Sequence, residues 1–93
     1  MTEFSLESKF MTSPDIQVRI LDGEAVLLNV QTGAYFGANK VGTAIWEHYS
    51  QGLTLGSAIE RILERFEVDQ QRAEQDVYAF TQLMLDKGLL LAD

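Results

Sequence analysis

The segment GAYFGANKVGTAIW, residues Gly33 to Trp46, decides the fold, because an extended aromatic stretch passes through one asparagine into a helix. Tyr35 and Phe36 lie between glycines, a pattern typical of a short strand bounded by turns. Asn39 suits a helix N-cap, and after it the apolar residues recur every three to four positions. The segment therefore predicts the joint at which a small sheet meets a helical bundle.

Two turns upstream of this joint predict a three-stranded antiparallel meander. Residues 16–20 alternate apolar and polar side chains, and Asp22-Gly23 suits a two-residue type I′ turn, because Gly readily accepts positive φ and Asp tolerates it. Residues 25–30 are apolar enough for a central strand. Gln31-Thr32-Gly33 predicts a second turn with the glycine in the left-handed position. The third strand then runs from Ala34 to Gly37 and forms an edge of the sheet.

Three helices are expected downstream of the meander. Gly52 ends the first helix as a left-handed cap, and Thr54 begins the second. Asp69 caps a third helix over about residues 70–87, which Gly88 ends. Residues 89–92 form a short final strand or an extended tail packed on the core. The expected fold class is α+β and winged helix-turn-helix-like, a three-stranded antiparallel meander followed by three helices.

The length and composition predict one small domain. Of the 93 residues, 46% are hydrophobic and 23% are charged, which is ordinary for a globular protein. Residues 1–14, which contain the only proline, are expected to form an N-terminal arm with one short extended piece, and residues 15–93 form the folded domain. Apolar runs are too short to cross a bilayer, and the first residues do not resemble a signal peptide. We therefore expect a cytoplasmic protein that does not bind membranes.

The charge balance argues against nucleic acid as a partner. The net charge is −7, which repels phosphate backbones. A recognition helix over residues 70–87 would carry Glu74, Asp76 and Asp86 against only Arg72 and Lys87. A winged-helix nucleic-acid binder is therefore the less favoured alternative, and a basic or neutral partner is expected.

No set of residues in the sequence predicts catalysis, a metal site or a cofactor. Cysteine is absent, which removes disulfides, thiolate nucleophiles and zinc–thiolate sites. His48 has Ala44 and Gly52 four residues away on either side, so it lacks a second metal ligand and is interpreted as a solvated histidine on a helix face. Ser50 and Ser57 have no candidate base nearby in the sequence. The glycines occur one per turn, not in a phosphate-binding loop.

The third strand is the exception, because the outer edge of a meander carries unpaired backbone groups. Such an edge is a template for an added strand, and a long helix beside it would supply side-chain pockets. A simpler interpretation is that Tyr35 and Phe36 alternate between core and solvent in an edge kept short to avoid aggregation. The residues alone leave both interpretations open.

Ordered motifs span most of the chain: Val26-Leu27-Leu28-Asn29, Thr32-Gly33-Ala34-Tyr35-Phe36, Asn39-Lys40-Val41-Gly42 with Ile45-Trp46, Asp76-Val77 with Phe80, and Lys87-Gly88-Leu89-Leu90. Over residues 15–91 these motifs resemble the PqqD family, the leader-recognition domains of pathways that modify ribosomally made peptides. The stand-alone proteins of lasso-peptide biosynthesis look most similar, through Thr-Gly-Ala-Tyr-Phe-Gly followed by Asn and Val-Gly. The sequence departs from the family at Ala38, where a larger apolar residue such as Leu is expected to set the depth of the adjoining pocket.

The resemblance implies a non-catalytic peptide chaperone or adaptor, a RiPP recognition element without cofactors. It would bind a precursor's leader peptide by β-strand addition, between the third strand and the third helix, and present it to a processing enzyme, with the leader peptidase of a lasso-peptide pathway favoured. The alternatives are a PqqD-type carrier that serves a radical SAM enzyme in PQQ biosynthesis, and a purely structural subunit whose edge a partner enzyme buries.

The resemblance also implies which residues contact the leader. The residues implied to pair with the leader through their backbone are Ala34, Tyr35, Phe36 and Gly37. The residues implied to contact it from the third helix are Asp76, Val77, Phe80, Thr81 and Met84. Asp76 is expected to meet a basic or amide group of the leader, with mere support of the helix surface as the alternative. Val77, Phe80 and Met84 are also candidates for the core.

Overall fold

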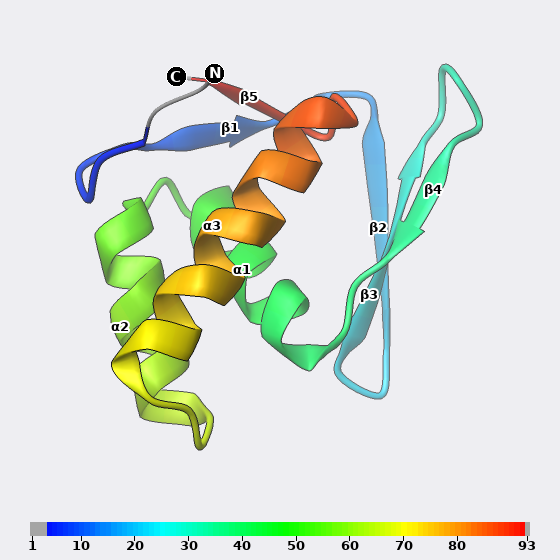
Figure 1. Cartoon of the computed structure of the whole chain (residues 1–93). Coiled ribbons are helices and arrows are strands. Elements are labelled where there is room, and N and C mark those ends of the chain that lie inside the picture. Colours follow the sequence, from blue (N-terminus) through cyan, green and yellow to red (C-terminus); the bar gives the residue numbers. More distant parts are fainter. Residues whose placement is uncertain (1–3, 93) are drawn as a thin grey trace.

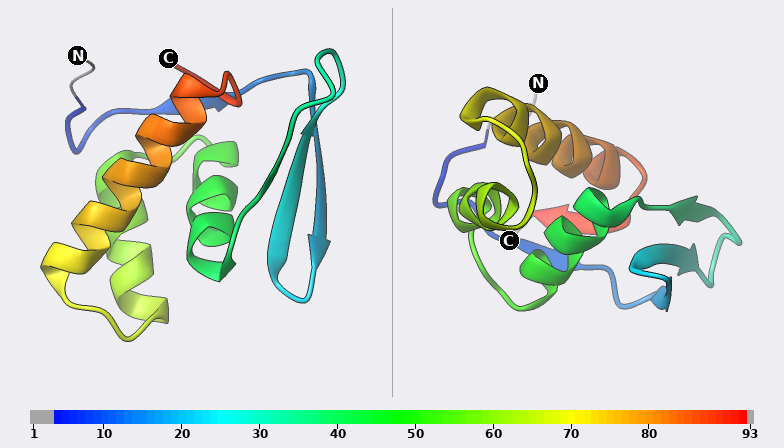
Figure 2. Two further views of the ribbon diagram at one scale, coloured as in Figure 1. Left: turned by 45° about the vertical axis from the view of Figure 1, so that its right-hand side comes forward. Right: turned by 90° about the horizontal axis from the view of Figure 1, so that it is seen from below.

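Two small antiparallel sheets and three helices are present in the computed structural model, which describes residues 4–92 (Figure 1). Residues 1–3 of the expected arm and residue 93 of the expected domain lie outside the described part. The three-stranded sheet lies to one side of the helices, and the two-stranded sheet lies at their end (Figures 1 and 2). The elements are β1 (Phe10–Thr12), β2 (Ile16–Leu21), β3 (Glu24–Asn29), β4 (Tyr35–Gly37), α1 (Lys40–Ser50), α2 (Leu55–Arg65), α3 (Gln70–Asp86) and β5 (Leu90–Ala92).

The predicted meander is confirmed, with the strand order β2-β3-β4. Its first turn has positive φ at both central residues, 54° at Asp22 and 80° at Gly23, as a type I′ turn requires. Its second turn has φ of 79° at Gly33. Leu27 of β3 lies opposite Val18 on one side and Phe36 on the other, so these three side chains share the face of the sheet that looks toward the helices.

The ends of the described chain form the second sheet. Strand β1 pairs antiparallel with β5, and Phe10 lies opposite Ala92. The expected extended piece of the arm is therefore a strand, and of the two forms expected for residues 89–92 the strand is the one present. Phe10 is buried in the common core with its ring centroid 5.0 Å from that of Tyr49. The boundary between residues 14 and 15 stays a prediction, although the arm contributes to the core.

All three predicted helix caps are present. The side chain of Asn39 accepts a hydrogen bond from the Gly42 N–H at 2.8 Å, and Thr54 and Asp69 do the same for α2 and α3. Each cap satisfies a backbone donor that the first helical turn leaves unpaired. The Asn39 cap lies in the joint between β4 and α1, so it fixes the direction in which the chain leaves the sheet.

A buried hydrogen bond links α1 to α3 within the core. The hydroxyl groups of Tyr49 and Thr81 are 2.7 Å apart, and Thr81 donates to the Val77 carbonyl at 2.6 Å, so Tyr49 is the donor to Thr81. Burial raises the pKa of Tyr49 to about 12. Apolar side chains from β3, all three helices and β5 fill the space around this pair. Among residues 4–92, no helix is both long enough and apolar enough to cross a membrane.

The Asn39 cap can be tested by substitution. Asn39→Ala removes the side-chain acceptor and leaves the Gly42 N–H without its partner, so the free energy of unfolding should fall by about 0.5–2 kcal/mol. Urea denaturation of the purified chain measures this. Asn39→Asp keeps an acceptor at the helix N-terminus and should retain the stability of the natural sequence. Equal stability of the Ala and Asp variants would contradict the assigned cap.

Candidate peptide-binding groove

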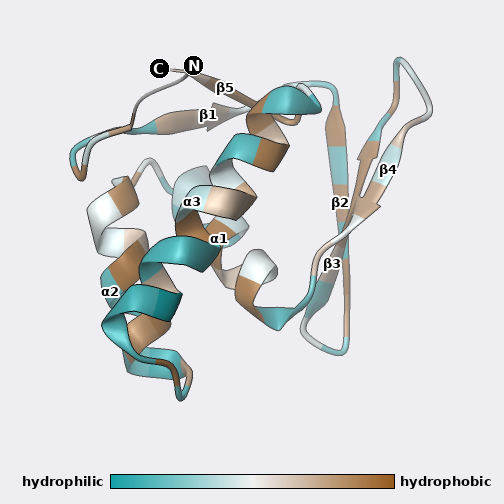
Figure 3. Cartoon of the chain, in the orientation of Figure 1, coloured by the Kyte–Doolittle hydropathy of each residue, from teal (hydrophilic) through white to brown (hydrophobic). Residues whose placement is uncertain are grey.

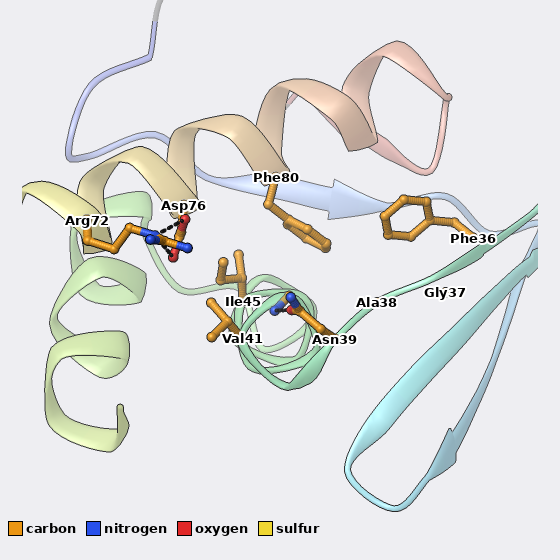
Figure 4. Close-up of a pocket in the computed structure, with 10 residues that line it drawn as sticks. Phe36, Gly37, Ala38, Asn39, Val41, Ile45, Arg72, Asp76 and Phe80 are labelled. Carbon is orange, nitrogen blue, oxygen red and sulfur yellow. Dashed lines mark hydrogen bonds and ion pairs between the residues drawn. The ribbon is translucent and has the colours of Figure 1, made fainter. Parts of the chain in front are cut away.

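A groove lies between β4 and α3, with the first turns of α1 as its floor (Figure 4). Its volume is about 310 Å³, and the side chains around it change from aromatic near the sheet to charged near the start of α3. The groove lies beside the predicted edge strand, where pockets for an added peptide were expected. Its lining residues are Phe36, Gly37, Ala38, Asn39, Val41, Gly42, Ile45, Arg72, Asp76 and Phe80.

The backbone of β4 presents a free edge to this groove. The Asn29 N–H donates to the Ala34 carbonyl, and the Ala38 N–H donates to the Ala25 carbonyl, both at 2.8 Å. Because the bonding direction alternates along an antiparallel strand, the Ala34 carbonyl and both backbone groups of Phe36 point toward β3.

Tyr35 and Gly37 direct theirs away from β3. Their two N–H and two C=O groups, four in all, have no hydrogen-bond partner within residues 4–92. Of the four residues expected to pair with the leader, Ala34 to Gly37, only Tyr35 and Gly37 have outward backbone groups that are free.

The side chains of β4 alternate in the complementary way. Phe36 points into the groove, where its ring centroid lies 6.4 Å from that of Phe80, at an interplanar angle of 64°. The Lys87 ammonium group lies 5.9 Å from the Phe36 ring centroid. Tyr35, on the other face, is 76% exposed. The two phenylalanines therefore form an aromatic wall on the inner side of the free edge.

Small residues at the floor allow this wall to lie against α1. A methyl group added at Gly42 would be only 3.0 Å from Phe80 Cε1 and 3.3 Å from Ala38 Cβ. Phe80 therefore packs directly on the helix backbone at Gly42. Ala38, where a larger residue was expected, is buried and contributes only a methyl group to the lining.

The opposite end of the groove is polar. Arg72 Nε donates to both carboxylate oxygens of Asp76, at 3.0 and 3.2 Å, from one turn earlier on α3 (Figure 4). Ion pairs this exposed contribute about 0–1 kcal/mol, so an incoming group can displace or join one at little cost. The Asp76 carboxylate is thus placed to accept a hydrogen bond from a ligand, and Arg72 competes with the ligand for it.

Comparison with known proteins places the chain in a family. The family model "Coenzyme PQQ synthesis protein D (PqqD)" matches residues 24–90, more than half of the chain. The chain belongs to the PqqD family. No curated protein matches the sequence.

The descriptions of two solved structures of similar proteins name a leader peptide. "TbiB1 in Complex with the TbiA(beta) Leader Peptide" shares 32% sequence identity with a TM-score of 0.79, over 86% of this chain and 93% of that one. "Lasso peptide synthetase B1 complexed with the leader peptide" shares 25% identity with a TM-score of 0.80, over 89% of this chain and 98% of that one. The predicted family and fold class are both confirmed.

The α3 residues that were expected to contact the leader divide between the groove and the core. Asp76 and Phe80 line the groove. Val77, Thr81 and Met84 are 0% exposed, and the Thr81 hydroxyl already bonds to Tyr49 and to the Val77 carbonyl. A ligand on the surface cannot reach these three without repacking of the core. We therefore assign Val77, Thr81 and Met84 to the core and keep Asp76 and Phe80 as groove residues.

Sequence reasoning assigned neither the lining residues of α1 nor Arg72 to the site. Val41 and Ile45 belong to the periodic apolar pattern after Asn39 and to the family motifs, yet they also form the floor of the groove. Arg72 was considered only as a charge on a possible DNA-binding helix. Its spacing of four residues before Asp76 is the signal that could have identified the pair.

His48 differs from its expected place on a solvated helix face. It is half-buried between α1 and α2, and its Nε2 lies 2.6 Å from Ser57 Oγ, although no base was expected near that serine. Ser57 donates its own hydroxyl hydrogen to the Thr54 carbonyl and accepts from the Thr54 hydroxyl, so His48 is a donor to Ser57. This arrangement ties two helices together and does not activate a nucleophile. Within the described residues, no group of three His, Cys, Asp or Glu side chains could hold a metal ion.

The histidine gives a pH dependence to stability. Burial lowers the pKa of His48 from its ordinary value of 6.5, and the charge of Arg61 lowers it further. The unfolded chain therefore takes up this proton first, so the free energy of unfolding should decrease as the pH falls below about 6.5. His48→Gln removes the titrating group and should flatten that decrease in urea denaturation at a series of pH values. An unchanged pH profile in the variant would contradict this role.

The contact between Phe80 and α1 predicts that Gly42→Ala destabilises the chain. The added methyl group must displace the Phe80 ring, and overpacking of this kind costs about 1–3 kcal/mol, partly offset by about 1 kcal/mol of improved helix propensity. Chemical denaturation and the NMR shifts of the Phe80 ring measure the effect. Gly37→Ala is the matched control, because an added methyl group there meets nothing within 4 Å. Unshifted Phe80 resonances in Gly42→Ala would refute the assigned contact.

Proposed function

We propose that this chain is a binding adaptor for the leader of a ribosomally made precursor peptide. The leader adds as a strand along β4 and places side chains in the groove beside α3. The observation that carries the proposal is the set of four outward backbone groups of Tyr35 and Gly37, directly beside a groove walled by Phe36 and Phe80. The leader peptides in the descriptions of two similar solved structures support it.

Alternate residues of the bound strand have different surroundings. In an added strand, every second side chain points to the face that Phe36 occupies, and so into the groove. An apolar side chain fits between the aromatic rings and the floor formed by Val41 and Ile45. Toward the start of α3, the Arg72–Asp76 pair favours a side chain that can both donate and accept hydrogen bonds. Specificity then comes from these pockets, while strand pairing supplies affinity independent of sequence.

The interaction energies allow useful but reversible binding. Four strand hydrogen bonds contribute roughly 0.5–1.5 kcal/mol each, and one or two apolar anchors roughly 1.5–3 kcal/mol each. Ordering a flexible leader costs roughly 2–5 kcal/mol, and the loss of association entropy opposes binding further. We expect a dissociation constant from below a micromolar to the micromolar range. That range suits a carrier that must later release its peptide.

The adaptor role does not require chemistry of the chain's own. Holding a precursor beside its processing enzyme raises the local concentration of substrate. The lasso-peptide description of one similar structure favours the leader peptidase of a lasso-peptide pathway as that enzyme. The family description, coenzyme PQQ synthesis, supports the alternative of a radical SAM enzyme.

Strand addition predicts that Tyr35→Pro weakens leader binding at least about tenfold. Proline removes an outward N–H, and its ring obstructs the added strand, whereas the bonds between β4 and β3 do not use that N–H. Titration with synthetic peptides from neighbouring small open reading frames, followed by calorimetry and amide shifts, measures the change. Tyr35→Ala is the control, because it removes the side chain and keeps the N–H. If Tyr35→Pro folds normally and binds with unchanged affinity, strand addition at β4 is wrong.

The same titration separates the rival functions. A nucleic-acid binder would bind duplex, and salt would weaken that binding steeply. A purely structural subunit would show no shifts with any free peptide, because its edge would be covered permanently by an enzyme. Leader binding instead shifts the amides of Tyr35 and Gly37 together with those around Phe80.

A further inference from the structure

Strand β2 presents a second free edge, at the other side of the sheet. The Val30 N–H donates to the Asp15 carbonyl at 2.9 Å, which fixes the alternation along this pair of strands. The residues that bond to β3 are therefore Gln17, Arg19 and Leu21, and the outward-facing ones are Ile16, Val18 and Ile20.

Most of these outward groups are unpaired. The Ile16 N–H donates to the Ser13 carbonyl at 3.2 Å. In the part of the chain that the structure describes, the Ile16 carbonyl and both backbone groups of Val18 and of Ile20 have no partner. The β2 edge thus offers five free groups, more than the four of β4.

Of the usual protections of an edge strand, β2 has one charged side chain, Arg19, which lies on the face of the sheet away from the helices. Natural edges are kept short, bulged, or marked by proline or an inward-pointing charge. Strand β2 runs for six residues in unbroken register with β3, and its inward-facing side chains are all apolar. Val18 and Ile20 are 41% and 48% exposed, beside a cavity of about 290 Å³ that Trp46 also lines. In the left view of Figure 2, β2 lies at the margin of the molecule, and Figure 3 shows its apolar bands.

The sequence of β2 is close to a palindrome, which suits pairing with an identical strand. Ile16-Gln17-Val18-Arg19-Ile20 reads apolar, polar, apolar, polar, apolar from either end. In an antiparallel pair centred on Val18, each Ile16 lies opposite Ile20 of the second copy, and each Gln17 lies opposite Arg19. No two like charges are directly opposed, and Val18 meets Val18.

The outward backbone groups fit this register. Val18 and its counterpart exchange two hydrogen bonds, and each Ile20 N–H reaches the Ile16 carbonyl of the other copy, which gives four hydrogen bonds in all. The Ile16 N–H can keep its bond to Ser13. A register shifted by one residue would oppose side chains of different faces and lose these bonds.

We propose that β2 is a self-association edge, and that two copies of this chain pair there to form one continuous sheet with the strand order β4-β3-β2-β2-β3-β4. The exposed inward faces of Val18 and Ile20 become covered by their counterparts. Both β4 edges lie at the outer ends of the joined sheet, so each copy keeps its groove. The dimer is therefore compatible with peptide binding but does not depend on it.

Charge makes the association weak at low salt. Each copy carries a net charge of −7, so two copies repel one another. Raising the salt concentration from about 0.1 M to about 1 M shortens the screening length from about 10 Å to about 3 Å and should increase the dimer fraction. Binding to a nucleic acid would have the opposite salt dependence.

The first experiment is sedimentation velocity of the full chain over a series of concentrations at both salt levels. The weight-average mass should rise from the monomer value of 10.4 kDa toward twice that value. In a mixture of labelled and unlabelled chains, isotope-filtered NMR should then show a contact between the Hα atoms of Gln17 and Arg19 of different copies, because opposed Cα atoms in such a pair lie about 4.5 Å apart. A monomer at every concentration up to the solubility limit, or intermolecular contacts elsewhere, overturns the proposal.

Substitutions at Val18 and at Tyr35 separate this edge from the groove. Val18→Pro removes an outward N–H and no hydrogen bond to β3, so it should fold, remain monomeric and bind leader peptide as the natural sequence does. If it does not fold, Val18→Lys serves instead, because it opposes two like charges at the centre of the pair. Tyr35→Pro is the matched control and should dimerise normally. Persistent dimers in a folded Val18 variant would overturn the assignment, whereas loss of leader binding in Tyr35→Pro alone tests the proposed function.

Discussion

Strand β3 is hydrogen-bonded along both of its edges, and this double pairing determines what the outer strands can do. Its even-numbered residues, from Glu24 to Leu28, bond to β2, and the odd-numbered residues between them face β4. Because bonding direction alternates along each strand, every backbone group of the outer strands is then assigned either to β3 or to the outside. The free donors at Tyr35 and at Val18 are both consequences of this one constraint.

The groove depends in addition on how closely α3 approaches α1. Gly42 and Ala38 leave room for Phe80 to lie on the start of α1. Phe36 lies opposite Leu27 in the sheet, so its side chain is on the same face and lies beside Phe80. The Asn39 cap fixes the short passage between β4 and α1 on which this packing rests. The groove is therefore preformed by core packing, so a bound peptide does not have to pay for ordering the protein.

Local residues made much of the fold predictable. Asp22-Gly23 and Gly33 define the turns of the meander through their positive φ, and Asn39, Thr54 and Asp69 cap the helices as expected. These features depend on interactions within a few residues of the chain. The pairing of β1 with β5 joins opposite ends of the sequence, and strands of three residues are too short to show a period.

The candidate site was predictable only in part for a similar reason. Helical spacing places Val77, Phe80 and Met84 on one side of α3, but it cannot show where the core ends and the groove begins. That boundary depends on the rotation of α3 relative to β4, which turns Phe80 toward Phe36 and leaves Val77 and Met84 in the core. The contact of His48 with Ser57 likewise depends on the angle at which α1 and α2 meet.

The two free edges illustrate how similar backbone chemistry supports different partners. Strand pairing itself is nearly independent of sequence, so the neighbouring side chains decide what binds. Beside β4, an aromatic wall and the Arg72–Asp76 pair form pockets that suit a peptide of unlike residues. At β2, the inward side chains repeat symmetrically about Val18, which suits an identical strand. Backbone hydrogen bonds and apolar contacts carry no net charge, so an acidic chain can use both edges even though it repels polyanions.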